Sequence, residues 1–284
     1  MFDFHTDKPR YFAMQRRIAA EYVVPMVAEH LAAPPPWRVL EVGCAEAGVL
    51  KAFLDGGHEV TGIELSPSRA SLAREFLADE IAAGRARIRT DDVYDVGPEA
   101  LEPRGFHVVV LKDVIEHIPQ QERMIPRLAE FLAPGGKIFF GFPPWMMPFG
   151  GHQQIARSGA VARVPWLHLL PRPVYARYLA AAGEPPRVRE ELTEIYDTGI
   201  TIERFERIVR EANLTIEARA LWLTNPIYAL KFGIPPRRQI GLLERVPILR
   251  NFLSTAAYYI VGADDPGAGG SMNRRQSLAY ATVD

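Results

Sequence analysis

Apolar positions along the chain fall into short runs typical of buried strands, and stretches with helical spacing separate most of these runs. Strands that alternate with helices need crossover connections, so the pattern predicts a largely parallel sheet with helices on both faces. The predicted strands in the first half are 38–42, 58–64, 86–90, 106–111 and 137–142. The predicted helices there are 11–31, 49–54, 67–83 and 120–132.

The alternation stops after residue 142. Segment 143–196 is rich in proline and aromatic residues, which predicts an insertion with short helices. A helix at 201–212 and strands at 214–223 and 256–261 then complete a seven-stranded sheet with an antiparallel edge strand. The chain therefore divides into a helical cap (1–36), an α/β core (37–142 and 197–263), a substrate-side insertion (143–196) and a flexible tail (264–284).

Composition narrows the function classes. The 33 basic residues balance 34 acidic ones, for a net charge of −1, so no general attraction to nucleic acid is expected. The single cysteine excludes an internal disulfide. The first residues carry charges where a signal peptide needs an apolar stretch, and no run of about 18 apolar residues follows. These features predict a cytoplasmic protein without an integral membrane segment.

The turn after the first strand carries the first chemical signal. Gly43 follows the strand directly, where a glycine lets the backbone approach a ligand closely. Glu64 ends the second strand, where its carboxylate can accept hydrogen bonds from both hydroxyls of a ribose. A dinucleotide site would prefer the spacing GxGxxG, and the glycines here are Gly43 and Gly48.

At these residues the chain resembles class I S-adenosylmethionine-dependent methyltransferases. Glu41, Gly43 and Cys44 match the family's first-strand motif, and Glu64 matches the ribose-binding acid. The resemblance implies an α/β Rossmann-like fold with S-adenosylmethionine as cofactor. It implies these cofactor-binding residues: Glu41, Gly43, Cys44, Ala45, Gly48, Glu64, Leu65, Asp92, Val93 and Lys112.

Two alanines depart from the family pattern, and one acid of the pattern has two candidate positions. Ala45 and Ala47 stand where the family has glycines, and an alanine methyl group disfavours positive φ angles. Asp92 matches the adenine-contacting acid after the third strand, and the neighbouring Asp91 is the alternative. We therefore expect a cofactor loop with slightly altered geometry.

The segment DVIEHI follows the fourth strand. Helical spacing there would place Asp113 and His117 on one face. Some ubiquinone-pathway O-methyltransferases, which this segment resembles, bind a divalent cation through a similar ExxEH sequence. A site at Asp113, Glu116 and His117 is therefore an alternative to the metal-free site that we expect. In the metal-free interpretation, His117 is a catalytic candidate or packs beneath the cofactor loop.

The stretch FPPWMMPFGGHQQ opens the insertion. Amino-methylating enzymes carry a proline-aromatic tetrapeptide after strand four, whereas FPPW follows strand five, so a nucleic-acid methyltransferase is not indicated. His152 is the other catalytic candidate, because an imidazole can accept a proton from the nucleophile. The aromatic residues of the insertion either line an acceptor pocket or form the insertion's own core. Likewise, the first helix either closes over the cofactor or packs on the domain.

The sequence thus predicts transfer of a methyl group from S-adenosylmethionine to a small-molecule acceptor, at oxygen before nitrogen or carbon. One alternative is a non-catalytic S-adenosylmethionine-binding partner or regulatory subunit. The other is an NAD(P)-dependent oxidoreductase, which the glycine spacing disfavours. The oligomeric state stays open.

Overall fold

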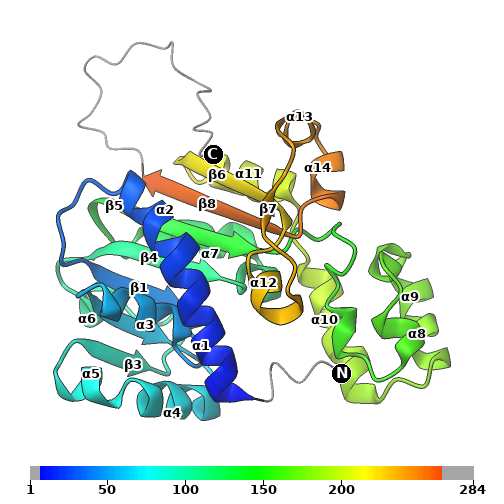
Figure 1. The fold of residues 1–284 in the computed structure, drawn as a ribbon, viewed down its shortest axis with the longest axis horizontal. Coiled ribbons are helices and arrows are strands. Elements are labelled where there is room, and N and C mark those ends of the chain that lie inside the picture. Colours follow the sequence, from blue (N-terminus) through cyan, green and yellow to red (C-terminus); the bar gives the residue numbers. More distant parts are fainter. Residues whose placement is uncertain (1–6, 264–284) are drawn as a thin grey trace.

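The computed structural model describes residues 7–263, so the predicted tail at 264–284 lies outside it. One mixed sheet runs through the molecule in the order β3-β2-β1-β4-β5-β8-β6-β7 (Figure 1). Its strands are β1 (Arg38–Val42), β2 (Glu59–Ile63), β3 (Ala86–Arg89), β4 (Phe106–Lys112), β5 (Leu132–Phe142), β6 (Leu214–Thr224), β7 (Arg237–Arg238) and β8 (Ala256–Ala263).

The first five strands are parallel, as the alternation of strands and helices predicted. β8 pairs antiparallel with both β5 and β6, which confirms antiparallel strands on that side of the sheet. The prediction of seven strands was one too few, because the two-residue β7 also pairs with β6. No alternation pattern can mark so short a strand, since its position depends only on pairing.

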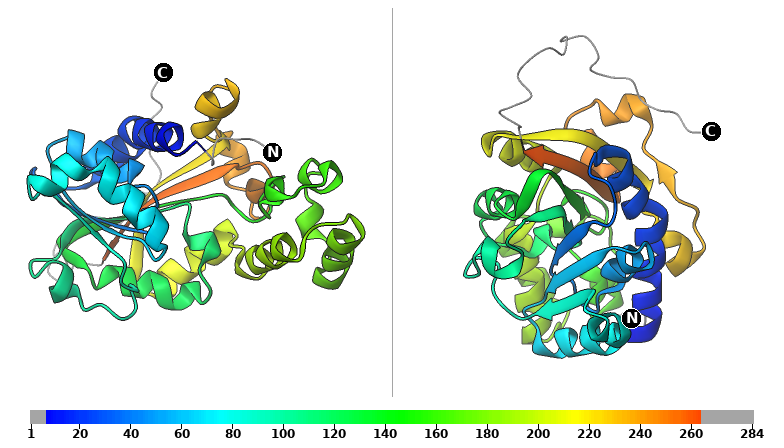
Figure 2. Two further views of the ribbon diagram at one scale, coloured as in Figure 1. Left: turned by 90° about the horizontal axis from the view of Figure 1, so that it is seen from below. Right: turned by 90° about the vertical axis from the view of Figure 1, so that its left-hand side faces the viewer.

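Helices cover both faces of the sheet (Figures 1 and 2). Side chains alternate along each strand, so Val108 and Val110 face one hydrophobic core while Val109 and Leu111 face the other. The helices before the insertion are α1 (Lys8–Ile18), the π-turn η2 (Ala19–Val23), α2 (Val24–His30), α3 (Gly48–Asp55), α4 (Pro67–Phe76), α5 (Ala78–Ala82), α6 (Pro98–Leu101), the 3₁₀ turn η3 (Ile115–His117) and α7 (Gln121–Ala129).

The insertion forms a lobe beside the sheet (Figure 2). It has its own small hydrophobic core, which includes Val161, Tyr175 and Leu192. The elements of the lobe are η4 (Gln153–Ile155), α8 (Gly159–Ala162), η5 (Leu167–Leu169), α9 (Arg172–Ala181) and α10 (Pro186–Thr198). The remaining helices are α11 (Ile202–Glu211), α12 (Ile227–Phe232), α13 (Gly241–Glu244) and α14 (Leu249–Phe252).

Two element boundaries differ from the sequence prediction for physical reasons. The long first helix contains the π-turn, which ends at Val23, two residues before Pro25, and this proline has no N–H to donate to the helix. β5 begins at Leu132, five residues before the predicted start at 137, and includes the sequence Pro134-Gly135-Gly136. Gly135 adopts a φ of +73°, so the chain bulges there and pairs again with β4.

Candidate active site

The order of the strands in the sheet determines where the candidate site lies. β1 and β4 are neighbours, and their connections leave in opposite directions across the sheet. Such a switch point opens a crevice at the carboxyl ends of the strands. The loops after β1 and β4 meet there, because a Cβ atom on Gly43 would lie 2.7 Å from Cγ2 of Val114. Position 43 therefore requires glycine for two reasons: its φ is +74°, and a Cβ atom would clash with Val114.

The loop after β1 holds two alanines in a conformation that favours glycine. Ala45 has a φ of 47° and Ala47 a φ of 65°, so both adopt the left-handed conformation. This conformation costs an L-residue roughly 1–2 kcal/mol. The expectation that alanine would alter the loop is therefore better described as local backbone strain, which the surrounding contacts hold in place.

Glu64 supplies one of these contacts. Its buried carboxylate accepts a hydrogen bond from the amide of Ala45 at 2.9 Å and from the amide of Ser66 at 2.8 Å. Each carboxylate oxygen has a second lone pair and can still accept from a ligand hydroxyl. The next residue, Leu65, leaves 62% of its surface exposed at the same edge. Glu64 therefore joins two loops and faces the crevice.

Other predicted cofactor residues lie nearby but present little side chain to a ligand. Gly48 begins α3 beneath α1, where an added Cβ would lie 2.7 Å from the carbonyl oxygen of Phe12. The side chains of Cys44 and Val93 are buried in the two cores. Gly48 thus allows two helices to pack, and Cys44 and Val93 can offer only backbone atoms to a ligand.

The two acids after β3, Asp91 and Asp92, have different hydrogen-bond partners. Asp91 forms a two-point ion pair with Arg89, with N–O distances of 2.7 and 3.0 Å. Asp92 accepts a hydrogen bond from the amide of Tyr94 through one carboxylate oxygen, at 2.9 Å. The arginine occupies both oxygens of Asp91, so Asp92 is the better placed of the two to accept from a ligand.

Glu41 is an acid inside the sheet. It is 3% exposed, and its Oε2 has no hydrogen-bond partner among residues 7–263. Burial raises the pKa of this carboxyl well above its usual value, although the charge of Lys112 opposes the shift. A polar group in this state can form a hydrogen bond with a ligand that enters the crevice.

The segment after β4 is not the predicted helix. Asp113 has a φ of 56°, and its amide donates to the carbonyl of Gly141 at 2.7 Å. A 3₁₀ turn, η3, follows instead. The prediction that Asp113 and His117 share a helical face was therefore wrong, because the left-handed Asp113 prevents the helix from starting there.

Asp113 is the centre of a charged cluster. Lys112 donates hydrogen bonds to Asp113 and, at 3.0 Å, to Oε1 of Gln15. Burial by itself would lower the pKa of Lys112, but the charge and hydrogen bond of Asp113, together with the nearby Tyr258 and Tyr11, raise it overall. For Asp113, burial opposes Lys112, and the lysine lowers the pKa of the carboxyl. Both groups are therefore ionised near neutral pH.

The first helix contributes to this cluster and also packs on the domain. Tyr11 accepts a hydrogen bond from Gln15 at 2.7 Å, and burial, reinforced by Asp113, raises the pKa of its phenol. On the other side of the helix, Phe12 contacts Phe76, with 4.7 Å between ring centroids. Arg16 pairs with Asp55 at 2.5 Å. Phe12 and Arg16 therefore pack the helix on the domain, and closure over the cofactor stays a prediction for Tyr11 and Gln15.

Helix α12 adds residues that the sequence did not single out. Burial raises the pKa of Tyr228, as does the charge of Asp113. Burial lowers the pKa of Lys231, while Asp113 opposes that shift. Nothing local marked these residues, because they lie more than a hundred positions beyond Asp113 in an irregular segment.

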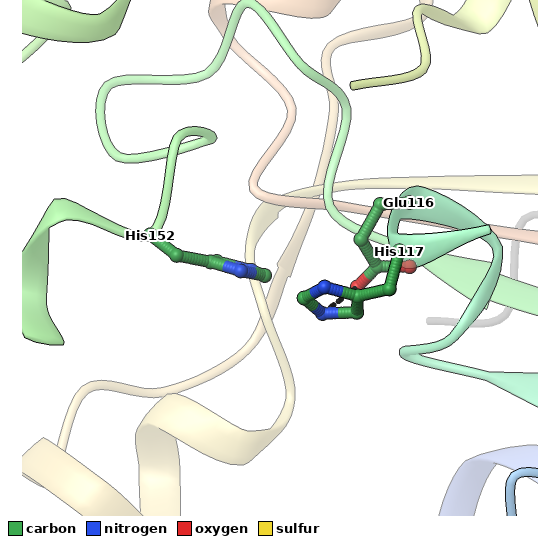
Figure 3. A group of neighbouring side chains, drawn as sticks. All are labelled: Glu116, His117 and His152. Atoms are coloured by element: carbon green, nitrogen blue, oxygen red, sulfur yellow. Dashed lines mark ion pairs between the residues drawn. The ribbon is translucent and has the colours of Figure 1, made fainter. Parts of the chain in front are cut away.

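The two candidate catalytic histidines meet at the mouth of the crevice. The rings of His117, from η3, and His152, from the insertion, point toward each other (Figure 3), and their centroids are 5.0 Å apart. Beside them, Glu116 is 3% exposed and lies 3.9 Å from Nε2 of His117. Neither of its carboxylate oxygens has a hydrogen-bond partner in the described part of the chain.

Burial controls the protonation of this group. It lowers the pKa of His117, although Asp113 opposes the shift. It raises the pKa of Glu116 well above its usual value, and Asp113 adds to the effect. An imidazole whose pKa is lowered is neutral near pH 7, so His117 can accept a proton from an acceptor hydroxyl.

The same three residues could also hold a cation. One ligand atom from each of Glu116, His117 and His152 lies within 4.8 Å of the others. Two imidazoles and a carboxylate suit zinc. Asp113, which the resemblance included in a metal set, is not in this group, and His152 takes its place.

Most aromatic residues of the insertion stabilise the insertion itself. Trp145 packs edge-on against His168 and Tyr196, and Tyr196 stacks on the fully buried Tyr175. His168 binds the carbonyl of Trp145 through Nε2 at 2.6 Å. These contacts favour the interpretation of these residues as the insertion's core.

A family comparison agrees with this geometry. Residues 13–183, more than half of the chain, match the family model described as "Methyltransferase domain". The chain belongs to this methyltransferase family. Among residues 7–263, no helix of the methyltransferase has the length and hydrophobicity needed to cross a membrane.

Curated relatives match over part of their length. The ubiquinone biosynthesis O-methyltransferase of Idiomarina loihiensis is 32% identical over 106 residues, which cover 36% of this chain and 41% of the relative. An uncharacterised methyltransferase of Mycobacterium leprae is 27% identical over 161 residues, covering 53% and 55% of the two chains. The chain thus spans about two fifths to about half of these relatives.

Solved structures share the fold. The plantazolicin methyltransferase BpumL in complex with SAH has a TM-score of 0.54 and 11% identity, with 92% of this chain and 89% of that chain covered. The magnesium protoporphyrin IX methyltransferase of Synechocystis with bound SAH has a TM-score of 0.50 and 12% identity, with coverages of 87% and 82%. At such identities the likeness establishes the Rossmann-like methyltransferase fold.

Proposed function

We propose that the protein transfers a methyl group from S-adenosylmethionine to a small-molecule acceptor, most readily at an oxygen atom. The observation that carries the proposal is the convergence of Gly43, Glu64 and Asp92 on one edge of the sheet, from the loops after β1, β2 and β3. The ubiquinone O-methyltransferase relatives favour oxygen as the acceptor atom. The SAH-bound structural neighbours support the cofactor.

In this proposal the cofactor supplies a methyl group already activated on a sulfonium. The chain binds and orients the reactants. Glu64 accepts hydrogen bonds from the ribose hydroxyls, Asp92 accepts from the adenine side, and the exposed Leu65 packs against the base. His152, aided by the adjacent His117, accepts the proton of the acceptor hydroxyl. Holding both reactants in line lowers the barrier through proximity.

The insertion forms the acceptor side in this proposal. It carries His152 to within ring contact of His117, which follows β4. The alternative of a non-catalytic binding subunit does not account for two histidines and a buried acid held at the mouth of the crevice. A nicotinamide-dependent oxidoreductase is disfavoured by a first loop whose left-handed positions are Gly43, Ala45 and Ala47 rather than a GxGxxG turn.

Calorimetric titration with S-adenosylmethionine and, separately, with NAD⁺ tests the cofactor. We expect binding of the first and none of the second. Asp92→Asn should weaken binding by about 10- to 100-fold, because a hydrogen bond to a charged group contributes about 1.5–3 kcal/mol. Asp91→Asn is the matched control, since Arg89 already occupies its carboxylate. Equal effects of both variants would contradict the assignment of Asp92.

A chelator tests whether the histidine group needs a metal. The sulfonium carries the reactivity, so we expect methyl transfer to survive dialysis against a chelator. Loss of activity that zinc or magnesium restores would show instead that Glu116, His117 and His152 bind a cation.

A further inference from the structure

The surface between α12 and α14 reverses the usual distribution of polar and apolar residues. Large apolar side chains point outward from this segment, and Leu242 alone is 75% exposed. Over the same stretch, polar side chains point inward. The exposed apolar residues are Phe232, Ile234, Ile240, Leu242, Val246, Ile248 and Leu249, and the buried polar ones are Gln239, Glu244, Arg250, Asn251 and Ser254.

The inward side chains hold this segment firmly on the domain. Arg250 binds Glu203 at 2.9 Å and Glu206 at 2.7 Å, both on α11. Asn251 accepts from the amide of Ile202 at 2.8 Å, and Gln239 donates to Ser254 at 2.8 Å. The outward apolar residues therefore belong to a segment that is held on the domain, and Figure 1 shows its helices α13 and α14 beyond β8.

The tip of this surface is strained. Ile248 has a φ of 68° and a ψ of −56°, and the amide of Leu249 donates to the carbonyl of Pro247 at 2.8 Å. These are the features of a γ-turn with positive φ, which is rare, and a positive φ is unusual for a β-branched residue. The turn presents two adjacent apolar side chains, Ile248 and Leu249, to the outside.

Charge distinguishes the possible occupants of the surface. Residues 231–250 contain five basic residues and one acidic residue, and among the basic ones the buried Arg250 is paired with Glu203 and Glu206 and adds no charge to the surface. The acidic residue, Glu244, is buried, whereas Arg237, Arg238 and Arg245 are exposed. A symmetric dimer through this surface would bring these arginines together. Single-stranded nucleic acid requires aromatic stacking platforms, and the outward residues are mostly aliphatic.

We propose that this surface, the apolar residues named above with Arg237, Arg238 and Arg245, docks the protein on an anionic lipid bilayer. Apolar side chains enter the boundary between headgroups and acyl chains, and arginines bind lipid phosphates. The surface begins on α12, whose Lys231 places Nζ 5.7 Å from the ring centroid of Tyr11 in the charged cluster. Docking therefore places one wall of the candidate site at the membrane surface.

Sedimentation of the full chain with lipid vesicles tests the proposal without cofactor or acceptor. We expect binding to vesicles that contain phosphatidylglycerol, weaker binding to phosphatidylcholine alone, and release by salt. Arg237→Ala and Arg245→Ala should each lower the partition coefficient about fivefold, because each basic residue near an anionic surface contributes about 1 kcal/mol. The double variant Ile240→Ser with Leu242→Ser should lower it by about tenfold or more.

The matched control is Val164→Ser with Val174→Ser, which removes two exposed apolar side chains from the insertion. This control should bind vesicles like the unchanged protein, and all variants should keep their thermal unfolding because the replaced side chains are exposed. Absence of binding to anionic vesicles, or an equal loss in the control, overturns the proposal. So does a dimer in light scattering that Leu242→Ser abolishes, since the occupant would then be a second copy of the chain.

Discussion

The two sides of the candidate site are built differently. On the proposed cofactor side, Gly43, Glu64 and Asp92 each lie within a few residues of a strand end, and backbone amides fix both acids. On the proposed acceptor side, Tyr11, Asp113, His152 and Lys231 come from four distant parts of the chain. One side is specified by local sequence and the other by tertiary packing. Changes to one side should therefore leave the other largely intact.

The largest effect is expected at His152. If its imidazole accepts the proton, His152→Ala should lower the turnover rate about 10²- to 10⁴-fold while cofactor affinity stays unchanged. Steady-state kinetics together with calorimetry separate the two quantities. His30→Ala, at the end of α2, is the matched control and should leave turnover unaffected. A rise in KM with little change in turnover would make His152 a wall residue instead.

Acidification should affect the insertion through His168. Burial lowers the pKa of this fully buried histidine to about 4, against about 6.5 in an unfolded chain. Between these values the unfolded state binds a proton that the folded state does not. The contribution of the neutral His168 to the free energy of unfolding is therefore fully present above pH 6.5. It is lost as the pH falls towards 4, by about 3 kcal/mol in total.

Fluorescence of Trp145, whose ring lies 4.5 Å from that of His168, can follow this loss during urea unfolding at several pH values. His168→Gln keeps a polar side chain at the position and removes the titration. Its unfolding free energy should depend less on pH in this window. An unchanged pH dependence would assign the effect to other buried histidines such as His58, whose pKa is also lowered by burial.

Glu64 tests the cofactor side. Glu64→Gln keeps the shape but removes the charge, so affinity for S-adenosylmethionine should fall by about 1.5–3 kcal/mol per lost charged hydrogen bond. The amide of Ala45 loses its charged partner as well, so the first loop should become less ordered. Calorimetry measures the affinity, and the contacts among Glu116, His117 and His152 should persist. An unchanged affinity in the folded variant would remove Glu64 from the cofactor site.

The smallest expected effect is at Ala45. Its φ of 47° is strained, and glycine relieves that strain while increasing the entropy of the unfolded chain. Ala45→Gly should therefore raise the unfolding free energy by about 0.5–1 kcal/mol. Ala176→Gly, in the middle of α9, should lower it by about 1 kcal/mol. Thermal unfolding of both variants shows whether the two changes in unfolding free energy have opposite signs. A loss of stability in Ala45→Gly would show that the loop is not strained.

The sequence by itself determined the sheet and the proposed cofactor side. The seven predicted strands are all present, because a short apolar run marks a strand that has a hydrophobic core on both faces. Gly43, Glu64 and Asp92 could be found from the sequence, because strand ends in a parallel sheet share one edge whatever lies elsewhere.

Only the tertiary structure decided the rest. The pairing of β7, the left-handed Asp113 and the meeting of His152 with His117 depend on contacts between distant segments, which periodicity does not encode. Nothing in the sequence marked the outward apolar side chains of α13 and α14 as exposed. These side chains are exposed because Arg250 and Asn251 occupy the interior beneath them. Local patterns report which residues prefer burial, whereas packing decides which of them are buried.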